Sequence, residues 1–139
     1  MIKASAKSLK EFYGNLGYLF YSIAAVDNNI TREEEDQIHK EVKERWLGLE
    51  NSHDNFGTDA AFEIEFVFDW IRDNAMSAKL AFKNFESFYH GNPNLFDEET
   101  IGLIYKSATH IAEAFHGSNK KESEVMIKLH ALLGKAQVA

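Results

Sequence analysis

The sequence contains no cysteine, a single proline and no long apolar run. Without cysteine, the chain has no disulfides, no thiolate zinc site and no thiol nucleophile. No run of about 18 apolar residues is present, and the first residues are too polar for the apolar region of a signal peptide. We therefore expect a cytoplasmic protein that is not inserted directly into a membrane.

Basic residues are also scarce. The chain has 15 Lys and Arg residues against 22 Asp and Glu residues, which gives a formal net charge of −7 at pH 7. Nucleic acids and anionic membranes are bound through basic surfaces. The charge therefore argues against a nucleic-acid partner and favours cations or basic proteins. The sequence also has no Gly-rich phosphate loop after a strand and no positional support for Ser-His-Asp catalysis.

The composition indicates one soluble domain. With 139 residues, of which 45% are hydrophobic, the chain can bury a sizeable core without cross-links. Apolar residues recur at intervals of three and four, which predicts helices over about 8–26, 31–49, 77–90, 97–115 and 119–134. We expect an all-α bundle of six to seven helices, and Asp97 should cap the helix that follows it.

The segment 62–70 is ambiguous because its apolar residues alternate as they do in a half-buried strand. Glu65, Asp69 and Arg72 nevertheless form a polar stripe at helical spacing, and no partner strand is evident elsewhere. We predict a helix. Because it is apolar around most of its circumference, we expect it to be the central buried helix, with Phe66 in the core.

An internal repeat relates the two ends of the chain. A shift of 88 residues places Ile23 on Ile111 and Glu34 on Glu122 without a gap. Two helical pairs related by this pseudo-repeat would therefore flank a central helical hairpin. The turns differ, because Asp27 of the first copy falls opposite Phe115 of the second.

Residues 23–30 read Ile-Ala-Ala-Val-Asp-Asn-Asn-Ile, and Glu34 follows; residues 111–116 read Ile-Ala-Glu-Ala-Phe-His, and Glu122 follows. In these motifs the chain resembles the tellurite-resistance TerB-like family, whose compact all-α fold has two such helical pairs. The resemblance covers nearly the whole of residues 1–139 and implies a divalent-cation site between the two motifs. Asp27, Glu34 and Glu122 are the candidate ligands, for Ca²⁺ or another divalent cation. Phe115 replaces the second motif Asp, which implies weak binding.

The same residues also have a structural interpretation. Asp27 can turn the chain, and Glu34 and Glu122 occupy the fourth position of capping boxes that begin at Thr31 and Asn119. The first copy is not an EF-hand, because hydrophobic residues stand where the first loop ligands would be. Both interpretations, cation ligands and caps, remain open from the sequence.

The resemblance implies a non-catalytic cytoplasmic module for interaction or sensing, related to stress response, with a protein partner. One alternative is a helical-bundle enzyme with a carboxylate and histidine metal site, because Glu113-x-x-His116 has the spacing found in di-iron bundles. Another alternative is an assembly protein that acts through an aromatic surface. Its candidate residues are Tyr18, Tyr21, Phe56 and Phe96.

Overall fold

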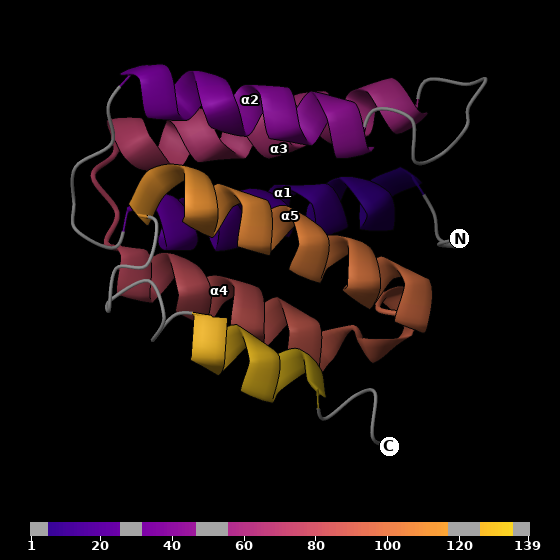
Figure 1. The fold of residues 1–139 in the computed structure, drawn as a ribbon. Coiled ribbons are helices and arrows are strands. Elements are labelled where there is room, and N and C mark those ends of the chain that lie inside the picture. Colours follow the sequence, from indigo (N-terminus) through magenta and orange to yellow (C-terminus); the bar gives the residue numbers. More distant parts are fainter. Residues whose placement is uncertain (1–5, 26–31, 47–55, 117–125, 135–139) are drawn as a thin grey trace.

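The computed structural model describes residues 6–25, 32–46, 56–116 and 126–134 (Figure 1). The helices are α1 (Ala6–Ala24), α2 (Arg32–Trp46), α3 (Phe56–Asp73), α4 (Ala78–Gly91) and α5 (Glu98–His116), with a 3₁₀ turn, η1 (Pro93–Leu95), before α5. Residues 126–134 are also helical. These described ranges contain no strand, so the predicted all-α fold is confirmed, and so is the helical prediction for 62–70. No helix in the described ranges has the length and apolar character needed to cross a membrane.

The helix at the centre of the fold is α1. It packs against α3, α4 and α5, while α2 packs against α3 and α5. Figure 1 shows α2 and α3 on one side of α1, and α4 and residues 126–134 on the other. The prediction that residues 62–70 form the central helix was therefore wrong. Residues of α1 that are fully buried, at the predicted spacing, are Phe12, Leu16, Phe20 and Ile23.

Two glycines of α1 allow α3 to lie very close. A Cβ atom at Gly17 would lie 2.9 Å from the Ile64 carbonyl oxygen and 3.0 Å from Val67 Cβ, and a Cβ atom at Gly14 would lie 3.3 Å from Val67 Cγ2. The side of α3 that faces α1 is consequently well packed, and its side chains Ile64, Phe68 and Ile71 are fully buried.

The part of the core between α1 and α4 is aromatic. Phe96, just after η1, lies with its ring centroid 4.8 Å from that of Tyr89, 5.3 Å from Phe12 and 6.0 Å from Phe85, in edge-to-face arrangements. Such contacts add to the free energy gained by burial. They hold the segment before α5 against α1 and α4.

Local hydrogen bonds set the helix ends around this core. The Asp97 side chain accepts a hydrogen bond of 2.7 Å from the Thr100 backbone N–H, which confirms the predicted cap of α5. After α3, Ala75 has a left-handed φ of 55°, and the Met76 N–H donates to the Ile71 carbonyl. The Tyr21 hydroxyl donates to the Met76 carbonyl and so fixes this turn to α1.

The two copies of the pseudo-repeat end their first helices at different positions. Helix α1 ends at Ala24, whereas α5 continues four residues beyond Ala112, the position that matches Ala24. Phe115, which stands opposite Asp27, is therefore inside a helix. Ala25, in the turn just after α1, therefore matches Glu113, which is inside α5.

Candidate functional site

The residues predicted to bind a cation lie mostly outside the described part of the chain. Asp27 and Glu122 are among the residues that the structure does not describe, and so is the side chain of Glu34. Glu34 is the third residue of α2, which is the position that the capping-box interpretation requires. Within the described ranges, no group of three His, Asp or Glu residues is placed to hold a metal ion. The cation site at Asp27, Glu34 and Glu122 stays a prediction.

The alternative metal-binding enzyme depended on Glu113 and His116. Glu113 is exposed on α5, whereas the carboxylate ligands of di-iron bundles project into the bundle. The side chain of His116 lies outside the described part. The position of Glu113 does not support this alternative.

A polar cluster joins α2 to α3. The predicted stripe of Glu65, Asp69 and Arg72 faces α2, where Arg72 forms an ion pair with Glu35. The Arg72 guanidinium also lies 3.0 Å from Asp73 Oδ1 and 3.7 Å from Asp69 Oδ1. The hydrogen bond with Glu35 raises the pKa of Arg72 above its ordinary value, so this cation stays charged in the fold.

Three polar atoms of this cluster are buried without a hydrogen bond: His39 Nε2, Glu65 Oε2 and Asp69 Oδ1. His39 Nε2 lies 3.5 Å from Asp69 Oδ1, which is an ion-pair contact but longer than a good hydrogen bond. Burial raises the pKa of the Glu65 carboxyl above its ordinary value, although the nearby His39 and Lys43 lower it in part. The cluster links α2 to α3, and its carboxylates make the side of α3 next to α2 acidic.

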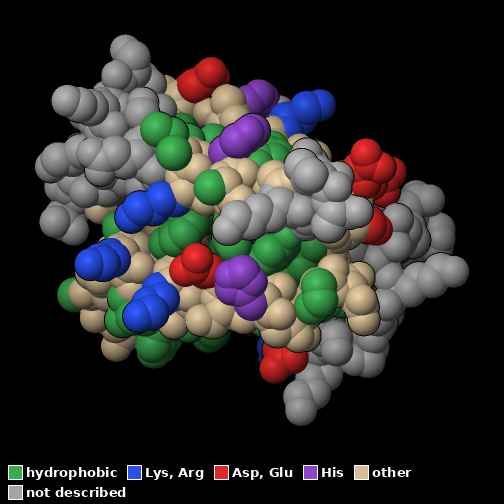
Figure 2. Space-filling model, turned by 90° about the horizontal axis from the view of Figure 1, so that it is seen from below, with side chains coloured by type: hydrophobic (Ala, Val, Ile, Leu, Met, Phe, Trp, Pro, Cys, Tyr) green, Lys and Arg blue, Asp and Glu red, His purple; other side chains and the backbone are tan. Residues whose placement is uncertain are grey.

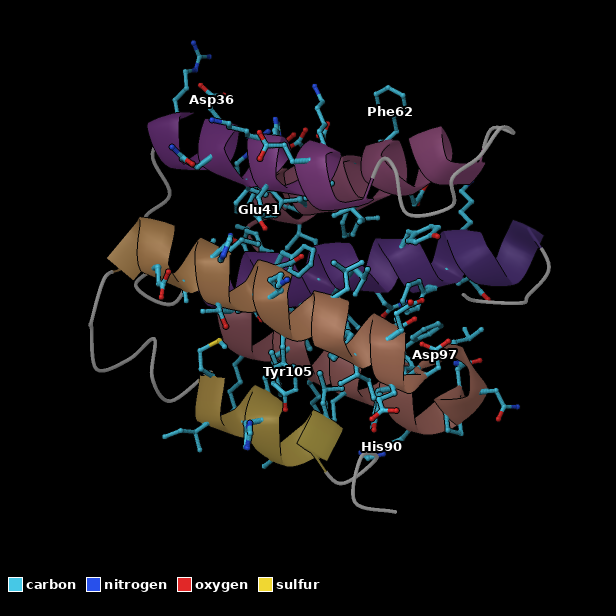
Figure 3. All side chains as sticks on the ribbon, turned by 45° about the vertical axis from the view of Figure 1, so that its right-hand side comes forward. Asp36, Glu41, Phe62, His90, Asp97 and Tyr105 are labelled. Atoms are coloured by element: carbon cyan, nitrogen blue, oxygen red, sulfur yellow. The ribbon has the colours of Figure 1, made fainter. Side chains whose placement is uncertain are left out.

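The outer side of α3 carries three exposed aromatic residues. Phe62, Phe66 and Trp70 are 57%, 66% and 47% exposed, and their spacing of four residues places them on one side of the helix. We call these three residues the α3 aromatic face. Figure 3 shows the Phe62 side chain pointing away from the bundle. The prediction that Phe66 lies in the core was therefore wrong.

The reason for this error is local. Apolar residues surround most of α3, so the periodicity alone does not decide which side packs. The close contact of Gly14 and Gly17 with Val67 and Ile64 decides it, and turns Phe66 outward. A spacing of four between Phe62, Phe66 and Trp70 was visible in the sequence, and it is the signal that could have identified the α3 aromatic face.

The size of the α3 aromatic face distinguishes it from ordinary exposed apolar residues. Aromatic side chains present about 150–250 Å² each, so three that are about half exposed leave roughly 350 Å² accessible. Single exposed apolar residues are common on protein surfaces. A contiguous patch of a few hundred Å² is often a binding site.

The aromatic surface proposed from the sequence used other residues. Tyr21 and Phe96 are buried in the core, Tyr18 is half-buried, and the side chain of Phe56 lies outside the described part. The prediction was therefore wrong for Tyr21 and Phe96. An exposed aromatic surface does exist, but it is formed by α3.

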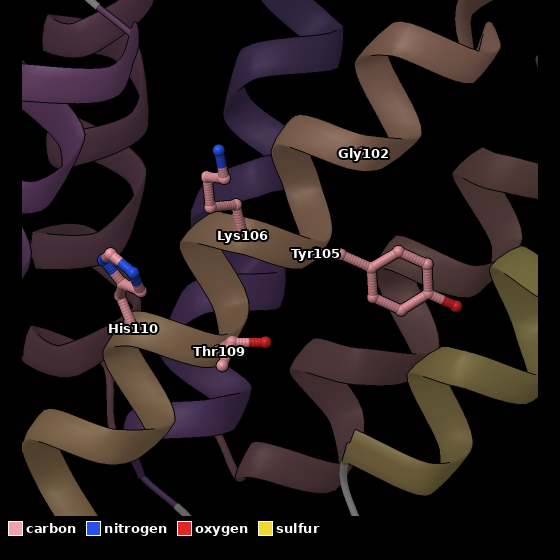
Figure 4. Close-up of a pocket in the computed structure, with 5 residues that line it drawn as sticks. All are labelled: Gly102, Tyr105, Lys106, Thr109 and His110. Carbon is pink, nitrogen blue, oxygen red and sulfur yellow. The ribbon is translucent and has the colours of Figure 1, made fainter.

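A shallow hollow of about 370 Å³ lies along α5 (Figure 4). The residues that line it are Gly102, Tyr105, Lys106, Thr109 and His110. The Tyr105 hydroxyl donates to the His130 carbonyl, and His110 Nδ1 lies 3.3 Å from Glu41 Oε1. The described residues that line the hollow all come from α5, and two of them are engaged elsewhere, so these residues do not direct converging polar groups at a ligand.

Two other large hydrophobic residues are exposed on elements other than α3. Leu80 of α4 is 47% exposed, and Ile127 lies in the helix 126–134. Figure 2, which shows the molecule from below, has hydrophobic side chains interspersed among charged and polar ones. Leu80 has the same exposed fraction as Trp70 but lies on a different helix, which makes it a suitable control position.

No family model matches the sequence, and comparisons with curated proteins and with solved structures found no match.

Proposed function

We propose that the protein is a non-catalytic interaction module that binds another protein through the α3 aromatic face. The observation that carries this proposal is the exposure of Phe62, Phe66 and Trp70 along one side of a helix whose other side is fully packed. Leaving this surface in water is unfavourable. At about 25 cal/mol per Å², covering roughly 350 Å² gains about 9 kcal/mol before the cost of association. Since association costs about 4–15 kcal/mol, the surface suits a partner that binds reversibly.

The proposed cellular role is that of a cytoplasmic module in a stress-response setting. The resemblance of the motifs around Asp27 and Glu122 to the TerB-like family supports this role, and the all-α fold is compatible with it. Weak binding of Ca²⁺ or another divalent cation by Asp27, Glu34 and Glu122 belongs to the same proposal. The net charge of −7 supports a protein partner over a nucleic acid.

The experiment that tests the proposal is affinity capture from native cell extract with three baits. The baits are the wild-type chain, a Phe62→Ser, Phe66→Ser double variant and a Leu80→Ser control. We expect wild type and the Leu80→Ser control to retain the same protein partner, and the α3 double variant to lose it. Circular dichroism and urea unfolding of each bait check that all three are folded.

Two results would contradict the proposal. One is retention of the same proteins by the α3 double variant and by wild type, which would place the binding surface elsewhere. The other is a partner lost equally by the Leu80→Ser control and the α3 double variant, which would indicate non-specific hydrophobic capture.

A further inference from the structure

The α3 aromatic face has acidic borders. On one side, Asp69 lies against His39 of α2 and Glu65 occupies the same stripe. On the other side, Glu63 lies toward α1, because its Oε2 atom would be 3.6 Å from a Cβ atom at Gly14. The Asp73 side chain is 66% exposed at the end of the helix.

The nearby cations do not neutralise these borders. Arg72 forms an ion pair with Glu35 and also contacts Asp69 and Asp73. Lys43 of α2 lies close enough to Glu65 for its charge to lower the pKa of that carboxyl. Among the described residues that these contacts identify, two cations, Arg72 and Lys43, stand beside five carboxylates, which are Glu35, Glu63, Glu65, Asp69 and Asp73. Counted over these described residues, the charge beside the aromatic face is net negative.

We propose that the partner of the α3 aromatic face is an α-helix whose apolar stripe is flanked by Lys or Arg residues. This inference rests on the proposed function and specifies the chemistry of the partner. Side chains four residues apart form a ridge along a helix, and such a ridge fits the groove between the ridges of a second helix. Lys and Arg on either side of that stripe would meet the acidic borders of α3.

Other occupants fit the surface less well. An extended peptide binds most readily by adding to a strand edge, and the described ranges contain no strand. A second copy of the chain would set the same acidic face against itself, since a two-fold contact uses one patch on both subunits. In such a contact the acidic border of one copy would meet an acidic border of the other, which is repulsive.

The inference can be tested with two synthetic helical peptides of about 20 residues. Both carry the same Leu residues at positions i, i+4, i+7 and i+11; the flanking positions are Lys in one peptide and Glu in the other. Each is labelled with fluorescein and titrated with the full chain, and fluorescence anisotropy reports binding. We expect the Lys peptide to bind at least about tenfold more tightly than the Glu peptide. Raising the NaCl concentration from about 50 to about 300 mM should weaken binding of the Lys peptide severalfold, because salt screens exposed charges.

Matched variants separate the aromatic and acidic contributions. We expect Phe66→Ala to weaken binding of the Lys peptide at least about tenfold, and Leu80→Ala to leave it unchanged. A Glu63→Gln, Asp73→Asn double variant should reduce the preference for the Lys peptide over the Glu peptide, because it removes charge while it keeps the aromatic residues.

Several outcomes would overturn the inference. These are equal binding of the Lys and Glu peptides, no binding of either, or a wild-type dimer in sedimentation velocity that Phe66→Ala dissociates. Binding to vesicles of phosphatidylcholine and phosphatidylserine that requires Phe66 would also overturn it. The proposed function fails differently, when capture of the protein partner from extract does not depend on Phe62 and Phe66.

Discussion

Phe66 and Phe68 are the same residue type on the same helix, yet they should respond very differently to replacement by alanine. Phe68 is fully buried, and its ring centroid lies 5.5 Å from that of Tyr21 in an edge-to-face contact. Phe66 is 66% exposed. The pair therefore tests which side of α3 packs against α1, while position along the helix is nearly the same for both.

The expected magnitudes follow from these environments. Phe68→Ala removes a ring with no exposed surface and leaves a cavity, which costs about 3–5 kcal/mol. This is a large share of the roughly 5–15 kcal/mol by which domains are stable. Phe66→Ala should change the free energy of unfolding by no more than about 0.5 kcal/mol. A small gain is expected, because Ala has the higher helix propensity.

Urea unfolding followed by circular dichroism measures both changes. The dependence of the unfolding free energy on urea should be the same in both variants, because the surface exposed on unfolding barely changes. A loss of more than about 1 kcal/mol in Phe66→Ala, together with a smaller loss in Phe68→Ala, would refute the orientation of α3. The α3 aromatic face would then not exist as an exposed surface.

Three further predictions address other contacts. Gly17→Ala should destabilise the protein by about 1–3 kcal/mol, because the added Cβ would lie 2.9 Å from the Ile64 carbonyl oxygen. Gly102→Ala, which has open space around it, should instead stabilise the protein by about 0.5–1 kcal/mol. Equal midpoints of urea unfolding for the two variants would contradict the close α1–α3 contact. The pKa of Glu65 is raised in the fold, so wild type loses stability as pH rises from the ordinary pKa of 4.5 through the folded pKa. Glu65→Gln should therefore be more stable than wild type at about pH 7 and lose this advantage at about pH 4. An advantage that does not depend on pH would rule out the carboxylate as its cause. Millimolar Ca²⁺, against a control of matched ionic strength, should raise the melting temperature by about a few degrees, and Asp27→Asn should abolish the rise; identical responses would rule out Asp27 as a ligand.

The sequence predicted the secondary structure of α3 but not its orientation. The stripe of Glu65, Asp69 and Arg72 identified a helix, because a strand would place these residues on both faces. Ile64, Phe66 and Phe68 are all apolar, so periodicity offered no choice between the two sides. The choice depends on Gly14 and Gly17, which lie far away in the sequence, and this fit between distant surfaces is not encoded in local periodicity.

The same limit applies to the polar cluster. Its α3 half was visible as a stripe, but its α2 half, Glu35 and His39, could not be assigned, because the pairing depends on how α2 is aligned along α3. Asp97 was recognised as a cap because a cap acts within four residues of chain. Local interactions were therefore predictable, whereas contacts between helices were not.

The acidic borders of α3 have two consequences for a surface that exposes three aromatic residues. Such a surface promotes self-association, and like charges around it oppose contact between two copies of the chain. The same carboxylates attract a helix that carries Lys or Arg beside its apolar stripe. Folding and binding then depend on different residues of the same helix, since Phe68 contributes to the core and Phe66 does not. Phe66→Ala should keep the unfolding free energy of wild type and lose the partner, and a variant that loses both would show that the two sides of α3 are not independent.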